Sequence, residues 1–233
     1  MKIARLQNKP EIFFSIQGEG RSIGTPSVFV RLSLCNLSCV WCDTAYTWNW
    51  KKYKKSEEMM EMSVEKVAKA VRPFECKNVV LTGGEPMLQQ RELAELMKLL
   101  KPEGYHFEIE TNATILPSPE FDALIDQYNC SPKLANSGVA ESLRVQPKAL
   151  HFFAQSPKAT FKFVIASQQD VTEVQATLVR NRIPKECVFL MPEAQTEQVL
   201  NEKAAWLTEL CTQEGLLYSD RLHIRLYGAR RGV

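Results

Sequence analysis

Three cysteines on one short segment are the residues of this chain best suited to chemistry. Cys35, Cys39 and Cys42 stand in the run C-N-L-S-C-V-W-C. Thiolates at this spacing can bind three irons of a cubic 4Fe–4S cluster, which usually takes four cysteine ligands. The next cysteine is Cys76, so no fourth ligand lies nearby. The spacing therefore predicts one iron that is open to a non-protein ligand, and such an iron is a place for chemistry.

Other cysteine chemistries fit this segment less well. A structural zinc site uses four protein ligands in paired spacing, and this segment has neither a histidine nor a second cysteine pair. Disulfides are disfavoured because seven cysteines is an odd number and the N-terminus has no apolar secretory region. A non-catalytic iron–sulfur carrier is an open alternative, although a carrier would usually bring a fourth cysteine.

Three further motifs could complete a site around these cysteines. Thr82-Gly83-Gly84-Glu85-Pro86 would let the backbone approach a ligand closely, because glycine has no Cβ. Gln17-Gly18-Glu19-Gly20 would form a tight loop around a polar ring. Asp43-Thr44 offers a neutral hydroxyl oxygen that suits a hard cation such as magnesium. Each motif alone is more often a plain turn than a binding site.

Arg31 is unusual because it interrupts the apolar run Val28–Leu34. A charged side chain inside such a strand needs a partner. Its planar guanidinium would suit a substrate carboxylate. The alternatives are that it reaches solvent or pairs with a carboxylate of the protein itself.

Short apolar runs alternate with segments of helical periodicity around these motifs. Strands are predicted at 28–34, 78–81, 106–110, 128–131, 159–165, 187–191 and 222–227, and helices at 63–71, 89–100, 121–127, 170–181 and 196–214. This alternation favours a parallel sheet with crossover helices. Ligands of such folds gather at the carboxyl ends of the strands, where the motifs fall.

Composition limits the class of protein. The chain has 233 residues, of which 45% are hydrophobic, enough for one domain with a sizeable core. A formal net charge of +2 argues against a nucleic-acid partner held by broad electrostatics. No apolar stretch is long enough to predict a membrane span. A reducing cytoplasm suits free thiols and an oxygen-sensitive cluster.

The motifs together resemble a known family. The spacing C-x-x-x-C-x-x-C with an aromatic before its last cysteine, and T-G-G-E-P, resemble the radical S-adenosylmethionine (SAM) superfamily. From about Phe14 to the end of the chain, the motifs Q-G-E-G, F-V-R-L, C-D-T, E-T-N, S-P-K, F-K-F-V and H-I-R-L-Y-G extend the resemblance to the 7-carboxy-7-deazaguanine synthases. The resemblance implies a partial, open β/α barrel of mostly parallel strands, formed as one domain over residues 1–233.

The same resemblance implies an activity. The family is homodimeric and converts 6-carboxy-5,6,7,8-tetrahydropterin to 7-carboxy-7-deazaguanine with loss of ammonia, using a 4Fe–4S cluster, SAM and magnesium. A glycyl-radical activase of the same superfamily is the rival enzyme. It would share the cysteine spacing and Gly83-Gly84, but it would not explain Gln17-Gly18-Glu19-Gly20, Arg31 or Asp43-Thr44.

Residue roles follow from the resemblance, motif by motif. The cluster loop 35–42 would supply the ligands Cys35, Cys39 and Cys42, and Thr44 would bind magnesium. The residues implied for SAM are Trp41, Asp43, Gly84, Glu110, Ser131, Pro132, Lys133, Met191, Pro192, Glu193 and Ala194. The residues implied for the pterin are Ile16, Gln17, Gly18, Arg31, Thr82, His223 and Val233, the last through the chain's terminal carboxylate.

Two stretches, near 46–63 and 135–153, look individual to this chain and could alter access to the pocket. The first holds a run of lysines, Lys51-Lys52 and Lys54-Lys55. Most such runs are solvated loops. The alternative is a docking patch for an acidic electron donor such as a flavodoxin.

Overall fold

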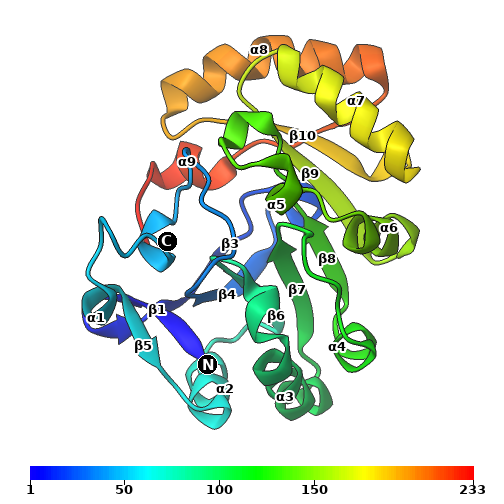
Figure 1. Cartoon of the computed structure of the whole chain (residues 1–233). Helices are drawn as coiled ribbons and strands as arrows, with labels where there is room; N and C mark the ends of the chain where they lie inside the picture. The colour runs from blue at the N-terminus through cyan, green and yellow to red at the C-terminus, as the bar shows by residue number, and fades with distance from the viewer.

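One curved, open sheet dominates the computed structural model, which describes residues 1–233. Its strand order is β11-β10-β9-β8-β7-β6-β4-β1-β2, with β3 beside β4 and β5 beside β1. Every neighbouring pair from β4 to β11 is parallel, whereas the pairs that involve β1 or β3 are antiparallel. The two edges of the sheet do not pair. The predicted partial β/α barrel of mostly parallel strands is therefore confirmed (Figure 1).

The elements have the following bounds. The strands are β1 (Lys2–Leu6), β2 (Lys9–Pro10), β3 (Ile12–Ile16), β4 (Pro26–Leu32), β5 (Met59–Glu61), β6 (Asn78–Gly83), β7 (His106–Thr111), β8 (Gln127–Cys130), β9 (Ala159–Ile165), β10 (Val188–Pro192) and β11 (Leu217–Tyr218). The α-helices are α1 (Lys55–Glu58), α2 (Val64–Val71), α3 (Gln90–Leu100), α4 (Pro119–Leu124), α5 (Glu141–Arg144), α6 (Pro147–Gln155), α7 (Gln169–Asn181), α8 (Glu197–Glu214) and α9 (Leu222–Tyr227). The 3₁₀ helices are η1 (Gly20–Ser22), η2 (Ala45–Thr47), η3 (Pro86–Gln89), η4 (Lys101–Glu103), η5 (Ala135–Ser137) and η6 (Lys185–Cys187).

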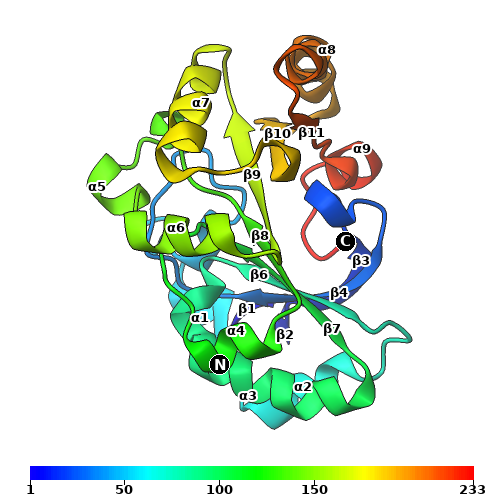
Figure 2. The same cartoon turned by 90° about the vertical axis from the view of Figure 1, so that its right-hand side faces the viewer.

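Helices α2, α3, α4 and α6 cover the outer face of the sheet, and the C-terminus lies on the other side of it, near β3 (Figures 1 and 2). Helix α2 shows how sequence directs this arrangement. Ser63 accepts a hydrogen bond from the backbone N–H of Lys66 at 3.4 Å and so caps the helix. Val67, Ala68 and Val71 then form the buried face of the helix. The helix predicted at 63–71 is confirmed.

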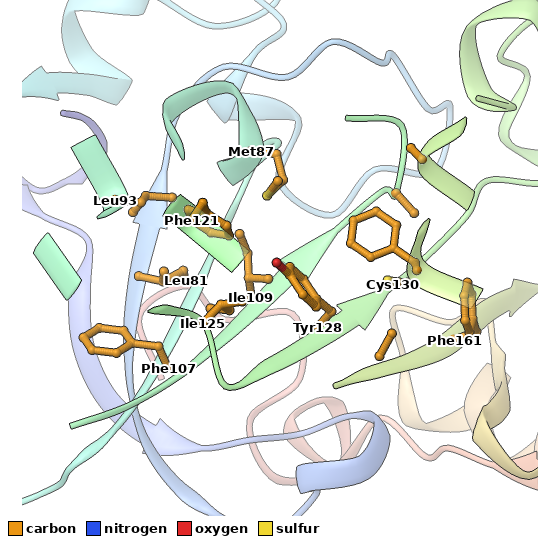
Figure 3. Close-up of a cluster of buried hydrophobic side chains, with 14 of the residues drawn as sticks. Leu81, Met87, Leu93, Phe107, Ile109, Phe121, Ile125, Tyr128, Cys130 and Phe161 are labelled. Carbon is orange, nitrogen blue, oxygen red and sulfur yellow. The ribbon is translucent and has the colours of Figure 1, made fainter. Parts of the chain in front are cut away.

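The main core lies between the sheet and these outer helices, in one cluster of 40 buried residues. Figure 3 shows Leu81, Ile109 and Tyr128 from neighbouring parallel strands packed together, with Phe121 from α4. The ring of Tyr128 also packs edge-on against that of Phe153 on α6, with centroids 5.0 Å apart. The strands that carry the candidate site residues are thus held rigidly from behind.

The strand predicted at 222–227 is wrong, because this segment is helix α9. Leu222, Ile224 and Leu226 alternate with polar residues as in a strand, but only Ile224 is buried. Gly228 donates its N–H to the carbonyl of Ile224 and adopts a positive φ, which ends the helix. The helix predicted at 121–127 is shorter, since Gln127 already belongs to β8. No helix of the fold has both the length and the apolar character that crossing a membrane requires.

Candidate active site

The three cysteines lie on the loop that follows β4, and all three line one cavity of about 330 Å³. Two N–H groups point at their sulfurs. The backbone N–H of Leu37 donates to Cys35 Sγ at 3.4 Å, and the indole N–H of Trp48 donates to Cys42 Sγ at 3.3 Å. Such donors favour the thiolate form, which is the form that binds a metal.

The spacing of these thiols suits a cluster. A mononuclear zinc site requires ligands that converge on one ion. A cubane cluster instead takes one thiolate per iron, so its ligands must be spread apart. All seven cysteines are free thiols. Burial raises the pKa of Cys35 to about 12, and only a strong cationic partner would deprotonate such a thiol at neutral pH.

Gly83 and Gly84 line the cavity and also allow close contact with the start of the cluster loop, a role that the sequence did not predict. A Cβ on Gly83 would lie 2.0 Å from the carbonyl oxygen of Leu32, and a Cβ on Gly84 would lie 2.0 Å from that of Leu34. Gly83 also has a φ of 129°, which favours glycine. The N–H of Gly84 donates to the carbonyl of Leu32 at 3.0 Å. The glycine pair therefore lets β6 lie directly against the start of the cluster loop.

Buried Glu85, which follows β6, connects the end of this strand to the end of β7. Its carboxylate accepts hydrogen bonds from the backbone N–H of Met87 at 2.9 Å, the hydroxyl of Thr111 at 2.9 Å and the backbone N–H of Asn112 at 2.7 Å. Burial raises the pKa of Glu85, while these donors oppose that rise. The carboxyl ends of β6 and β7 are thereby fixed beside the cysteines.

One wall of the cavity gathers three residues expected to contact SAM. The Nζ of Lys133 lies 5.5 Å from the ring centroid of Trp41 and donates to the hydroxyl of Ser131 at 2.8 Å. The indole N–H of Trp41 donates to the carbonyl of Asn136 at 3.1 Å. All but Asn136 line the cavity. An aromatic face, a hydroxyl and a cation thus lie together beside the cluster loop.

A second wall is a network of charges around buried Lys162 and Arg221. Lys162, in the middle of β9, lies 2.6 Å from a carboxylate oxygen of Glu19 and 3.0 Å from one of Glu110. Arg221 donates through Nε to Glu19 at 3.1 Å and through Nη2 to Asp43. Burial would raise the pKa of Glu19, but Lys162 and Arg221 outweigh it and hold that pKa well below its ordinary value. Each of these five side chains lines the cavity.

His223 lies against Gly18 and not on a strand. A Cβ at Gly18 would lie 2.2 Å from Nδ1 of His223, so only glycine fits beneath this ring. The His223 Nε2 lies 3.7 Å from Glu19 Oε1. Burial lowers the pKa of His223 although Glu19 opposes the shift, which favours the neutral imidazole at pH 7.

Arg31 has found a protein partner, one of the alternatives considered from sequence. Its Nε donates to Glu11 Oε1 at 2.9 Å. Neither Nη group donates a hydrogen bond to the protein, and the side chain lines the cavity. Part of the guanidinium is therefore available to a molecule bound in the cavity. Arg31 therefore has the means to bind an anion as well as the carboxylate that positions it.

Most of the residues predicted for the site do meet in this cavity. The residues that line it are Ile16, Gln17, Gly18, Arg31, Cys35, Cys39, Trp41, Cys42, Asp43, Thr44, Thr82, Gly84, Glu110, Ser131, Lys133, Met191, His223 and Val233. Four predicted residues do not line it: Pro132, Pro192, Glu193 and Ala194. Glu193 instead pairs with Lys203 at 2.9 Å, and the carbonyl of Ala194 accepts a hydrogen bond from Arg221.

Sequence reasoning missed five charged residues of the cavity, which are Glu19, Lys162, Arg221, Arg230 and Arg231. Glu19 was visible only as part of a glycine loop. Lys162 interrupts the apolar strand F-K-F-V, and a buried charge there signals a partner across the sheet. Arg221 carried no signal, because it lies outside every motif and its partners Glu19 and Asp43 are about two hundred residues away.

Comparisons with known proteins agree with this geometry. Residues 30–136 match the family model of the radical SAM superfamily. An open β/α barrel with three cluster-spaced cysteines after its first parallel strand defines the chain as a radical SAM protein, which implies a 4Fe–4S cluster and SAM. A 7-carboxy-7-deazaguanine synthase of Pyrobaculum aerophilum is 41% identical over 224 residues, 95% of each chain. The chain belongs to the 7-carboxy-7-deazaguanine synthase family.

Two further comparisons extend this finding. The 7-carboxy-7-deazaguanine synthase of Halobacterium salinarum is 35% identical over 93% of this chain and 89% of its own length. The crystal structure of QueE from Escherichia coli has the same fold, with a TM-score of 0.70 and 24% identity over 96% of this chain and 95% of that one. The similarity therefore runs through almost the whole chain.

Proposed function

We propose that this chain converts 6-carboxy-5,6,7,8-tetrahydropterin to 7-carboxy-7-deazaguanine with loss of ammonia, a step toward 7-deazapurines such as queuosine. The observation that carries the proposal is a shared cavity: the three cluster cysteines line it together with Gln17, Arg31 and the charged wall around Lys162. A carboxylated pterin needs a cation for its carboxylate and amide or carboxylate groups for its ring. Both requirements are met beside the place of the cluster.

When bound, the cluster and SAM would supply a carbon radical that removes hydrogen from C6 of the pterin. The protein's part is to hold and orient the reactants and to exclude water. Arg31 would bind the substrate carboxylate through the Nη groups left free by Glu11. Gln17, whose amide donates to Glu110 at 3.1 Å, would present its oxygen to the ring. Trp41, Ser131 and Lys133 would hold SAM, as would Asp43, Gly84, Glu110 and Met191, which line the same cavity.

We further propose that Thr44 binds magnesium together with the substrate. Its hydroxyl lines the cavity, donates to the carbonyl of Gly83 at 3.3 Å and lies 3.8 Å from Cys42 Sγ. A neutral hydroxyl is a weak ligand, so substrate and water oxygens would complete the shell. We expect chelation of magnesium to reduce product formation at least tenfold while SAM cleavage continues. Equal turnover with and without magnesium would contradict this role.

The function is tested by anaerobic turnover of the reconstituted, reduced protein with SAM, magnesium and 6-carboxy-5,6,7,8-tetrahydropterin. Mass spectrometry should find a product that has lost ammonia, with the absorption spectrum of a deazaguanine. SAM cleavage without this product would discard the substrate and keep the superfamily. A loaded and reducible cluster that cleaves no SAM would favour the carrier, and a glycyl radical on an added partner protein would favour the activase.

The lysine run is proposed as the docking patch for an acidic electron donor such as a flavodoxin. Trp48, which contacts Cys42 Sγ, precedes the exposed residues Lys51 and Lys52 by only a few positions. The run therefore lies along the chain directly beyond the cluster loop. Its positive charge would steer a negative partner toward the cluster.

Reversing these charges with Lys51→Glu and Lys52→Glu should raise the apparent KM for flavodoxin roughly tenfold, since electrostatic steering would become repulsion. Turnover driven by dithionite should not change. Lys148→Glu, an exposed lysine on α6, is the matched control. Flavodoxin-driven turnover that ignores the reversal would remove the proposed patch.

Three broader properties belong to the same proposal. One continuous core of 40 buried residues supports a single domain over residues 1–233. A homodimer is inferred from the family resemblance and would be measured by light scattering of the purified protein. A cytoplasmic location is inferred from seven free thiols and an oxygen-sensitive cluster.

A further inference from the structure

The tail after α9, residues 228–233, forms part of the cavity wall. It leaves α9 at Gly228 and returns across the open side of the sheet, so that the C-terminus lies close to β3 in both views (Figures 1 and 2). Such a tail carries no regular hydrogen-bond ladder of its own. Side-chain contacts must therefore hold it in place.

Arg231 is that anchor. Its Nη1 donates to Glu58 Oε2 at 2.8 Å, and its Nη2 donates to Glu11 Oε2 at 2.9 Å and to the carbonyl of Arg5 at 2.9 Å. The guanidinium also lies 3.4 Å from the ring centroid of Tyr46. Two carboxylates and an aromatic face, all from the N-terminal quarter of the chain, thus grip one side chain of the tail.

Glu11 connects this anchor to the proposed substrate site. Its carboxylate is completely buried and accepts from Arg31 Nε at 2.9 Å and from the Tyr46 hydroxyl at 3.0 Å. The same group therefore positions the guanidinium proposed for the substrate carboxylate and receives the anchor of the tail. Movement of Arg231 would therefore disturb the tail and also, through Glu11, the guanidinium of Arg31.

Glu58, like Glu11, does not line the cavity, and it contacts the tail through Arg231. It is the last residue of α1, within the stretch 46–63 that looks individual to this chain. We propose that Glu58 is a positioning residue, which holds Arg231 and through it keeps the tail closed over the substrate. This inference rests on the proposed function, and it gives the 46–63 stretch a role in closing the pterin site.

Glu58→Gln tests the proposal, with Glu57→Gln as its matched control. Glu57 is the neighbouring residue on α1, but it pairs with exposed Lys54 and not with the tail. Loss of a charge-assisted hydrogen bond should loosen the tail, so that its hydrogen-bonded amide, that of Gly228, should exchange with deuterium roughly tenfold faster in Glu58→Gln. The KM for the pterin should rise by a similar factor, while the Kd of SAM stays unchanged. Glu57→Gln should match the wild-type protein in all three measurements.

A double-mutant cycle separates positioning from a general loss of structure. If Glu58 acts through Arg231, then adding Glu58→Gln to Arg231→Gln should change tail exchange by less than twofold. Additive effects, or a tail as protected in Glu58→Gln as in Glu57→Gln, would overturn the proposal. Faster exchange throughout the core would also overturn it, because the role would then be structural. The exchange measurements hold even if the chain makes no deazaguanine, so failure of the proposed function would be recognised separately.

Discussion

Cys39→Ala is expected to abolish both cluster binding and SAM cleavage. Cys39 is buried at the wall of the cavity, and without it only two thiolates would face four irons. The visible absorption of the reconstituted protein should fall to that of the apoprotein, and iron analysis should find well under one cluster per chain. SAM cleavage should fall to the uncatalysed background.

Cys76→Ala is the matched control for this change. Cys76 is also a free, partly buried thiol, but it lies outside the cavity and donates to the carbonyl of Pro26 at 3.2 Å. It should retain the full cluster content and the full rate of SAM cleavage. An active Cys39→Ala protein, or equal losses in both variants, would refute the assignment of the cluster ligands.

Lys162→Met is expected to destabilise the protein by about 3–5 kcal/mol, because removal of one partner from a buried ion pair leaves charge uncompensated. Lys162 is the only cation within ion-pairing distance of Glu110, whereas Glu19 keeps Arg221. For a chain of this size the thermal midpoint should fall by roughly 10 °C. Lys148→Met, an exposed lysine on α6, should leave the midpoint within about 2 °C.

The decrease in stability caused by Lys162→Met should depend on pH. Wild-type Glu19 has a pKa below its ordinary value of 4.5, so the stability that its ion pairs add is present at both pH 8 and pH 5 and is lost only as the pH falls below 4.5. The variant lacks part of this contribution. Burial already raises the pKa of Glu110, and without Lys162 it would rise further, which favours the folded state at low pH. The difference in thermal midpoint between the wild-type protein and Lys162→Met should therefore be smaller at pH 5 than at pH 8. A larger difference at pH 5 would contradict the proposed pairing of Lys162 with Glu110.

Local signals were sufficient for the parallel strands β4, β6, β7, β8, β9 and β10, but not for β1, β2, β3, β5 and β11. Ser63 before the helical periodicity of α2, and apolar runs that end at glycines or cysteines, depend on neighbouring residues and are visible in any single sequence. The segment Leu222–Tyr227 shows where this fails. Its alternation is typical of a strand, but the sheet already ends at β11, and the segment packs Ile224 against Ala194 and Leu200 as a helix.

The site likewise contains residues that local sequence predicts and residues that it does not. The cysteine spacing is a property of one loop and was therefore predictable. Arg221 and Lys162 act through partners at sequence separations of 52 to 202 residues, which no local pattern encodes. Gly83 and Gly84 could be predicted as necessary glycines, but not that the backbone of Leu32 and Leu34 would approach them so closely.

This contact between β6 and the cluster loop also implies an order of assembly. The backbone that presents Cys35 is held by hydrogen bonds from Gly84 and Glu85, which the ribosome makes some fifty residues later. Closing that loop costs entropy until β6 has paired with β4. A nascent chain that ends before residue 78 would therefore contain all three cysteines, but the loop that carries them would not yet be folded for cluster binding. Cluster insertion should follow the docking of β6, so that only chains whose first parallel strands have folded become loaded.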